Sequence, residues 1–344
     1  MPQANRFALV ITSIFEPTKA VLEIARQNCN DSFDFIIAGD KKSPASYEIS
    51  NCTYYTLEQQ QNDIFTLGRL CPTGHYARKN LGYLLAISRG CQHLLETDDD
   101  NIPLPSFWST PQRQVKARLC RDRDWVNIYR YFTDTLIWPR GLPLNRIQDQ
   151  PTPLTALAEE ELHCPIQQGL ADENPDVDAL YRLICKLPQS FPGQHHVALS
   201  KGSWCPFNSQ NTIWFPEAYP LLYLPAYCSF RMTDIWRSFV AQRICWENGW
   251  SLLFSPASVY QERNEHDLMK DFKDEVSGYL HNEAIASSLG ALNLSAGIHN
   301  IPDNMLRCYR QLIELDLIDA SELQLLQAWL DDLAAMPEPP VQPA

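Results

Sequence analysis

The chain has 344 residues, enough for one large domain or two modest ones, and its 45% hydrophobic residues and nine Trp are typical of a well-packed globular protein. Its formal net charge of −13 argues against sequence-independent nucleic-acid binding, which depends on a basic surface. An acidic protein that binds an anionic substrate therefore needs a local basic cluster or a metal ion as an adapter.

The eleven Cys are scattered singly and include no CxxC pair, which predicts reduced thiols rather than a disulfide framework. The N-terminus enters a strand-like run without the basic and apolar regions of a signal peptide. No stretch reaches the apolar length of a membrane span. Together these features predict a soluble, cytoplasmic protein with no transmembrane segment.

The first part of the chain alternates between strand-like and helix-like segments. Residues 7–12 and 35–38 are continuous apolar runs, as in strands buried on both faces, and residues 53–57 form a third short run. Pro17 and Thr18 predict the start of the intervening helix. This rhythm predicts a parallel sheet with right-handed crossovers, whose ligands bind at the carboxyl ends of the strands.

Asp40 stands just after the second strand-like run, where its carboxylate can contact the base or ribose of a nucleotide. A solvated turn Asp is the alternative interpretation. A helix is predicted over residues 77–87, with Arg78 and Lys79 in its first turn. Cations there oppose the helix dipole, but they are favourable if they and the helix N-terminus bind a diphosphate together. Two solvated basic residues are the alternative.

The most distinctive stretch is Asp98-Asp99-Asp100, which follows a short apolar run. Side chains alternate in an extended chain, so Asp98 and Asp100 are expected to point the same way. Their charges repel unless a cation lies between them, and Mg²⁺ or Mn²⁺ suits oxygen ligands while keeping positions open for substrate phosphates. Asp-x-Asp at a strand end is the sugar-nucleotide signature of GT-A glycosyltransferases. The alternative is an acidic turn.

Two polar segments follow in the middle of the chain. Asp172 and Glu173 lie in an acidic cluster ahead of an amphipathic helix and are candidates for acceptor binding; solvated acids at a helix start are the alternative. Asn208 and Asn211 lie in an amide-rich segment that suits hydroxyl recognition, although a polar turn explains it nearly as well.

Two further candidates lie toward the C-terminal third. Asp234 stands at the start of a long predicted helix, where an N-cap role alone would explain it. His266 lies in a dense polar stretch after a strand, and imidazole can bind Mn²⁺, although a lone His more often has a structural role.

Between about Phe7 and about Tyr279 the chain resembles the catalytic domain of the STELLO glycosyltransferase-like family and, more distantly, the reversibly glycosylated polypeptides, which are UDP-arabinopyranose mutases. Several motifs in the same order carry this resemblance: YARKNLGY (76–83), ETDDDN (96–101), WPRG (138–141), GLADENPD (169–176), FNSQNT (207–212), TDIWR (233–237) and YQERN (260–264).

The resemblance implies an α/β protein of the GT-A fold, with a central, mostly parallel sheet flanked by helices. Residues 1–280 would form the nucleotide-sugar-binding and catalytic domain and residues 281–336 a helical appendage. Residues 337–344 are Pro-rich and predict a disordered tail.

The resemblance also implies a site for a UDP- or GDP-linked sugar, with Mn²⁺ or Mg²⁺ held by Asp98 and Asp100, and with His266 as a late metal ligand. Asp234 would take the place of the acceptor-side base. The implied nucleotide-sugar-binding residues are Asp40, Arg78, Lys79, Asn80, Asp98 and Asp99.

The expected function is therefore metal-dependent transfer of a sugar from a nucleotide-diphosphate sugar to a carbohydrate or glycoconjugate acceptor. Two alternatives remain: a nucleotide-sugar mutase, and a catalytically silent binding or scaffold protein with the GT-A fold.

Overall fold

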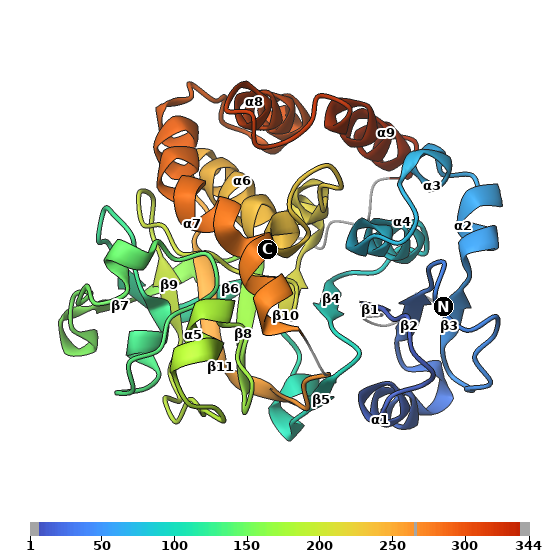
Figure 1. The fold of residues 1–344 in the computed structure, drawn as a ribbon, viewed down its shortest axis with the longest axis horizontal. Coiled ribbons are helices and arrows are strands. Elements are labelled where there is room, and N and C mark those ends of the chain that lie inside the picture. Colours follow the sequence, from blue (N-terminus) through green and yellow to red (C-terminus); the bar gives the residue numbers. More distant parts are fainter. Residues whose placement is uncertain (1–6, 265–266, 338–344) are drawn as a thin grey trace.

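The computed structural model of the protein describes residues 7–264 and 267–337. Eleven strands of these residues form one sheet in the order β3-β2-β1-β4-β10-β8-β11-β9-β6-β7, with β5 paired to β11 (Figure 1). The strands are β1 (Ala8–Thr12), β2 (Asp34–Ala38), β3 (Thr53–Tyr55), β4 (Leu94–Thr97), β5 (Asn101–Pro103), β6 (Gln114–Cys120), β7 (Ala158–His163), β8 (Ile166–Asp172), β9 (Val197–Leu199), β10 (Asn211–Trp214) and β11 (Leu252–Gln261).

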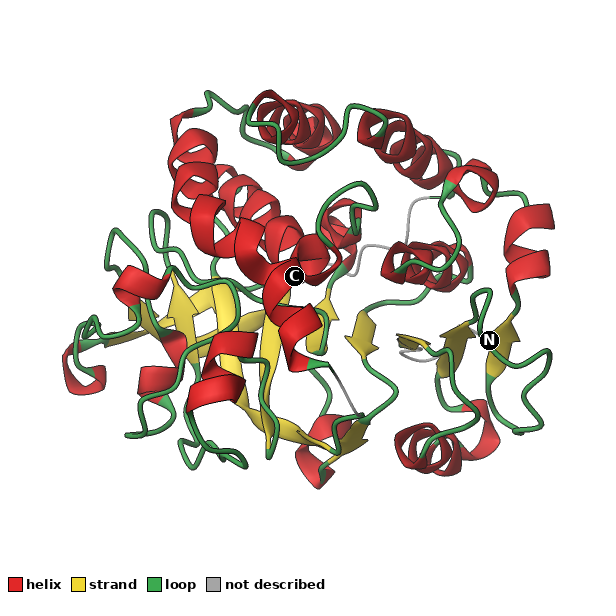
Figure 2. Ribbon diagram, in the orientation of Figure 1, coloured by secondary structure: helices red, strands yellow, loops and turns green. Residues whose placement is uncertain are grey.

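Helices cover both faces of this sheet (Figure 2). Short 3₁₀ turns join several elements, among them η2 (Tyr76–Arg78) and η8 (Phe230–Met232). The α-helices are α1 (Lys19–Gln27), α2 (Leu57–Asn62), α3 (Thr66–Leu70), α4 (Lys79–Ser88), α5 (Ala179–Ile184), α6 (Thr233–Glu247), α7 (Leu268–Ala291), α8 (Ile301–Glu314) and α9 (Glu322–Ala334).

Both faces of β1 are buried, as its continuous apolar sequence predicts. Successive strand residues point to opposite faces. Val10 therefore packs in the large core that includes α4, whereas Leu9 and Ile11 pack in a second core that includes α1. Figure 2 shows these two helices on opposite faces of the sheet. Thr18 caps α1 by accepting a hydrogen bond from the Val21 amide, which confirms the predicted helix start.

The strands β3-β2-β1-β4 pair in parallel, and this confirms the expected strand–helix rhythm. Beyond β4 the sheet is mixed, because β10 runs antiparallel between β4 and β8, and β8 then pairs in parallel with β11. An ion pair also joins β4 to α6, because Arg237 of α6 lies 2.9 Å from the fully buried carboxylate of Glu96 in β4. The predicted α/β architecture with a central sheet flanked by helices is confirmed and is consistent with a GT-A-like fold.

The helices after residue 280 are continuous with the rest of the protein. The expected domain boundary at 280/281 falls inside α7, and residues of α8 and α9 pack in the same core as the sheet. Asp332 of α9 accepts hydrogen bonds from the amides of Thr66 and Leu67 at the start of α3, each at 2.9 Å. Helix α9 therefore holds the start of α3 in place. Apart from Pro337, the expected tail lies outside the described residues.

Candidate functional site

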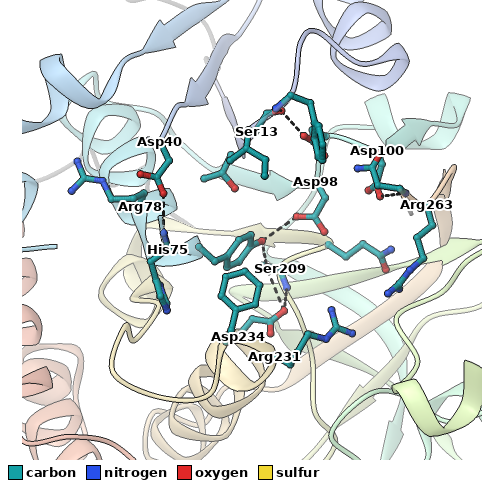
Figure 3. A pocket seen from close by; sticks show the side chains of 18 of the residues that line it. Ser13, Asp40, His75, Arg78, Asp98, Asp100, Ser209, Arg231, Asp234 and Arg263 are labelled. Atoms are coloured by element: carbon teal, nitrogen blue, oxygen red, sulfur yellow. Dashed lines mark hydrogen bonds between the residues drawn. The ribbon is translucent and has the colours of Figure 1, made fainter. Parts of the chain in front are cut away.

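A cavity of about 630 Å³ lies at the carboxyl ends of β1, β2 and β4. Its wall includes Ser13 after β1, Asp40 after β2 and Asp98 after β4 (Figure 3). Parallel strands of α/β proteins present their ligand sites at this edge. The cavity is therefore the candidate functional site. The residues that line it are as far apart in the sequence as Thr12 and Lys270.

Asp98 is held by two groups of the cavity wall. Its Oδ1 accepts a hydrogen bond from the Tyr76 hydroxyl at 3.0 Å and lies 3.3 Å from Lys79 Nζ. Burial raises the pKa of Asp98 to about 6; the charge of Lys79 opposes this shift and that of Asp100 adds to it. A cation bound beside Asp98 would lower this pKa and favour the ionised form.

Asp99 and Asp100 also line the cavity, although the chain turns at these residues and is not extended. The expected alternation of side chains therefore does not apply. The Asp99 carboxylate accepts a hydrogen bond from the Ser13 hydroxyl, and burial raises the pKa of Asp99 to about 7. Asp100 accepts hydrogen bonds from Gln261 Nε2 at 3.0 Å and from the Asn264 amide at 3.3 Å.

The carboxylates of Asp98 and Asp100 suit a hard divalent cation, which prefers oxygen ligands. Within residues 7–264 and 267–337, no three His, Cys, Asp or Glu side chains are arranged to hold a metal ion. The predicted third ligand, His266, lies outside the described residues. Mg²⁺ is often bound by only one or two carboxylates, with substrate phosphates and water completing its coordination. The residues present fit a cation of that kind.

Asp40 lies in the cavity wall and binds the backbone of the loop that precedes η2. Its carboxylate accepts hydrogen bonds from the amides of Gly74 at 2.9 Å and His75 at 2.8 Å, and also from its neighbour Lys41 at 2.7 Å. The side chain thus holds in place the loop leading to Tyr76. Contact with a nucleoside stays a prediction for this residue.

Arg78 borders the cavity, but its guanidinium points away from Asp98 (Figure 3). Its Nη1 donates to the carbonyl oxygens of Gly68 and Cys71, each at 3.0 Å, and its Nε donates to Gln60 Oε1 at 2.9 Å. The side chain is fully buried. These contacts correct the expectation that this guanidinium reaches a diphosphate, because they tie it to the segment around α3.

Lys79 and Asn80 are buried as well and do not line the cavity. Lys79 Nζ donates to the carbonyl oxygen of Thr97 at 2.7 Å and to the Tyr76 hydroxyl at 2.9 Å, behind Asp98. The Asn80 side chain makes two hydrogen bonds, both at 2.9 Å, with the backbone of Leu224. Lys79 therefore acts on the site through Asp98, and Asn80 has a structural role. The expected diphosphate contacts of both residues are corrected accordingly.

Asp234 lines the cavity within an ion-pair network. Arg140 donates to it from Nη1 and Nη2, each at 3.0 Å, and the Ser209 amide donates at 3.2 Å. Burial alone would raise the pKa of Asp234, but the charge and hydrogen bonds of Arg140 hold it below its usual range. Met232 is the N-cap of α6, so the alternative role of Asp234 as a helix cap is wrong.

None of the four predicted acceptor-binding residues lines this cavity. Asp172 and Glu173 line a second, smaller depression of about 470 Å³, which shares Gln261 with the main cavity. Asn208 is buried and accepts a hydrogen bond from the Gln210 amide at 3.0 Å. Asn211 is buried too, and its side chain donates to Ser258 Oγ at 2.8 Å and to the carbonyl oxygen of Leu170 at 3.1 Å. The structure does not bring these four residues together with the Asp triplet.

Several cavity residues were not singled out from the sequence. Phe15 and Phe230 line the cavity and remain 46% and 48% exposed, which is unusual for large apolar side chains in a protein that buries most of its aromatic rings. Arg231 and Arg263 supply cationic groups to the wall. Arg263 lies within the YQERN motif and Arg231 lies two residues before TDIWR, but nothing in the local sequence shows that they face the same cavity.

Comparison with known proteins identifies relatives of this chain. The family model described as STELLO glycosyltransferases matches residues 231–338. "Probable glycosyltransferase STELLO2" of Arabidopsis thaliana is 24% identical over 328 residues, covering 86% of this chain and 40% of that protein. "Probable glycosyltransferase STELLO1" of the same plant is 25% identical over 325 residues, covering 87% and 41%. The chain is therefore similar to the STELLO glycosyltransferases.

The chain spans about two fifths of the length of the curated relatives that it matches. The family-model match begins at Arg231, and six residues of the cavity wall lie within it: Arg231, Asp234, Gln261, Arg263, Asn264 and Lys270. A solved structure titled "Crystal Structure of a Mycobacterial Protein" is 12% identical, with a TM-score of 0.41, over 81% of this chain and 75% of that one. Of the residues described, none belongs to a helix long and apolar enough to cross a membrane.

Proposed function

We propose that the protein is a glycosyltransferase that transfers a sugar from a nucleotide-diphosphate sugar to a carbohydrate or glycoconjugate acceptor. The observation that carries the proposal is the position of the Asp98 and Asp100 carboxylates, which line one cavity at the strand ends of an α/β sheet. The names of the STELLO relatives support the reaction class.

We further propose that Asp98 and Asp100 hold Mn²⁺ or Mg²⁺. When bound, the cation would neutralise charge on the diphosphate leaving group. The chain itself supplies Tyr76 and Lys79, which fix the orientation of Asp98, and Gln261, which fixes that of Asp100. These contacts hold the two carboxylates in place before a ligand arrives, so less ordering has to occur on binding.

Exposed rings in the wall support binding of a ligand with flat or apolar faces. Phe230 packs edge-on against His75, with ring centroids 5.6 Å apart, and against Tyr76 at 6.3 Å. Its remaining surface is accessible from the cavity side, as is that of Phe15. A nucleobase or the apolar face of a sugar can stack on such a ring. The donor base, UDP or GDP, stays open.

Nucleotide binding measured by calorimetry tests this function. We expect UDP or GDP to bind the wild-type protein only with Mn²⁺ or Mg²⁺, and Asp98→Ala and Asp100→Ala to abolish that binding. Asp99→Ala should weaken binding less, because Asp99 is not one of the two proposed metal ligands. Asp149→Ala is the control, since this carboxylate is exposed and pairs with Arg146 at the surface.

Incubation with radiolabelled nucleotide sugars and tracking of the labelled products then separates the alternatives. Transfer of the label to an acceptor or to water supports the proposal, and an isomerised nucleotide sugar would indicate a mutase. Metal-independent nucleotide binding that is equal in wild type and Asp100→Ala would contradict the proposed site.

A further inference from the structure

A cluster of arginines lies at the side of the cavity opposite Asp40 and His75. Arg231 extends from η8 and Arg263 from the segment after β11, and Figure 3 shows both on the far side of Asp98 from Asp40. The proposed nucleotide-sugar function does not use these two side chains. They therefore raise the question of which ligand group they contact.

Each guanidinium has one carboxylate partner on α7 among the residues described. Arg231 Nε donates to Glu275 Oε1 at 3.0 Å, and its Nη2 lies 2.9 Å from the same oxygen without a hydrogen bond. Arg263 Nη2 donates to Asp271 Oδ2 at 2.9 Å. A guanidinium has five N–H groups, so both arginines retain donors that these contacts do not use.

The two guanidinium groups also lie within electrostatic reach of each other. Burial lowers the pKa of Arg263, and the like charge of Arg231 lowers it further, whereas the carboxylates of Asp271, Asp176 and Asp100 raise it. Arg182 shows the same two effects. Burial and then the charge of Arg263 lower its pKa to about 9, with a smaller contribution from Arg231, whereas Asp176 and Glu275 raise it. The buried Nε of Arg182 has no hydrogen-bond partner within the described part of the chain. Like charges gathered in a cavity wall are relieved by an anion between them.

We propose that Arg231 and Arg263 bind a second anionic group, a phosphate or a carboxylate, that the sugar or the acceptor carries beyond the diphosphate. This proposal rests on the proposed function. If the diphosphate lies at Asp98 and Asp100 and the nucleoside extends toward Asp40 and His75, the arginines face the sugar and acceptor end. Planar guanidinium groups bind such oxyanions through paired hydrogen bonds.

Sulfate is the probe for the test, because it is a tetrahedral dianion that does not need a metal ion to bind. In EDTA, calorimetry should show saturable sulfate binding to the wild-type protein, and Arg263→Gln should weaken it at least about tenfold, the loss expected for one charged hydrogen-bonding partner. Arg121→Gln is the matched control, because Arg121 pairs with one carboxylate, Glu160, at the surface.

Arg231→Gln alone leaves the buried Glu275 without its cation, so a folding defect could mask the result. The double variant Arg231→Gln/Glu275→Gln removes both charges together and should also weaken sulfate binding about tenfold. Unchanged sulfate affinity in folded Arg263→Gln and in the double variant would overturn the proposal. The sulfate titrations test the anion site even if no nucleotide binds. Their outcome is therefore independent of the proposed function.

A second arm uses saturating Mn²⁺ with whichever of UDP and GDP binds more tightly. Sulfate should bind this complex with an affinity within about threefold of that for the free protein, because the two anions occupy different places. Displacement of sulfate would overturn the proposal and assign the arginines to the diphosphate. If Arg263→Gln weakens the binding of UDP-glucuronate more than that of UDP-glucose, the anion belongs to the donor sugar. If the variant changes the affinities for the two nucleotide sugars equally, the anion belongs to the acceptor.

Discussion

Arg140 binds Asp234 through two hydrogen bonds, from Nη1 to Oδ1 and from Nη2 to Oδ2, each 3.0 Å long. It binds Asp176 in the same manner, from Nε and Nη2, each at 2.8 Å. One buried guanidinium thus joins the turn before Gly141, the loop after β8 and the first turn of α6. Arg140 therefore holds together the part of the cavity wall that contains Asp176 and Asp234.

Replacement of Arg140 should destabilise the protein strongly. Arg140→Gln would leave Asp176 and Asp234 without their shared cation in a buried position, so we expect the free energy of unfolding to fall by about 3–5 kcal/mol. Urea denaturation measures this change. Arg121→Gln, which removes an exposed ion pair, should cost no more than about 1 kcal/mol. Equal losses in the two variants would show that the network contributes little.

Asp234→Asn tests the predicted base directly. Arg140 keeps Asp176, so the variant should fold and bind donor as the wild type does. We expect turnover to fall less than about tenfold, because a carboxylate whose pKa is held low by Arg140 accepts protons weakly. A general base contributes on the order of 10²–10⁴-fold to rate. A loss of that size, with unchanged donor affinity, would support the predicted catalytic role of Asp234.

Titration of the Asp99 carboxyl should make the free energy of unfolding depend on pH. The pKa of Asp99 is about 7 in the folded protein, whereas an unfolded Asp has a pKa of roughly 3.9. Between these values the folded state binds the proton that the unfolded state releases, so this group lowers stability as the pH rises through that window. Asp99→Asn cannot titrate. It should therefore raise the free energy of unfolding at pH 8 by about 1–3 kcal/mol more than at pH 5.

Denaturation of both proteins at the two pH values measures this difference. Asp149→Asn, at an exposed surface position, serves as the control and should show no comparable pH dependence. If Asp99→Asn shifts stability equally at pH 5 and pH 8, the Asp99 carboxyl does not titrate as described.

Arg78→Ala should act on stability and not selectively on phosphate binding. The change removes three hydrogen bonds of a fully buried guanidinium, so we expect a loss of about 3 kcal/mol or more. Affinities for nucleoside and nucleoside diphosphate should then weaken alike. Arg26→Ala, which removes a mostly exposed side chain of α1, is the control. A selective loss of diphosphate affinity would return Arg78 to the ligand site.

Phe230→Ala should affect ligand binding more than folding. The ring is about half exposed, so its removal should change stability by less than about 1 kcal/mol. Loss of a stacking surface for a nucleobase should weaken nucleoside binding by about 1–3 kcal/mol. Calorimetry with the free nucleoside measures this, with the exposed Leu280→Ala as control. Unchanged nucleoside affinity would show that the base binds elsewhere.

The sequence predicts the N-terminal elements well because their signals are local. An apolar run buried on both faces, as at Val10, and a helix cap, as at Thr18, depend on neighbouring residues alone. The place of the Asp triplet at a strand end follows from the same kind of pattern. The conformation of the triplet does not, because its turn depends on the pairing of β5 with the distant β11.

The contacts of the predicted site residues could not be read from the sequence, because they come from distant segments. A cation in the first turn of a helix can point toward a ligand or back into the fold, and Arg78 does the latter because acceptors on Gln60 and Gly68 surround it. Similarly, the sequence does not reveal an ion-pair partner for Asp234, because Arg140 comes to lie against it only in the tertiary structure.

The pairing of Glu96 with Arg237 has a consequence for the order in which the protein can fold during synthesis. The ribosome releases β4, with its acidic side chain, long before α6 and its guanidinium emerge. Until then, burial of Glu96 would leave an uncompensated charge, so β4 cannot settle in its final place. The first half of the nascent chain should therefore remain open, with the Asp triplet unformed as a site, until translation has passed α6.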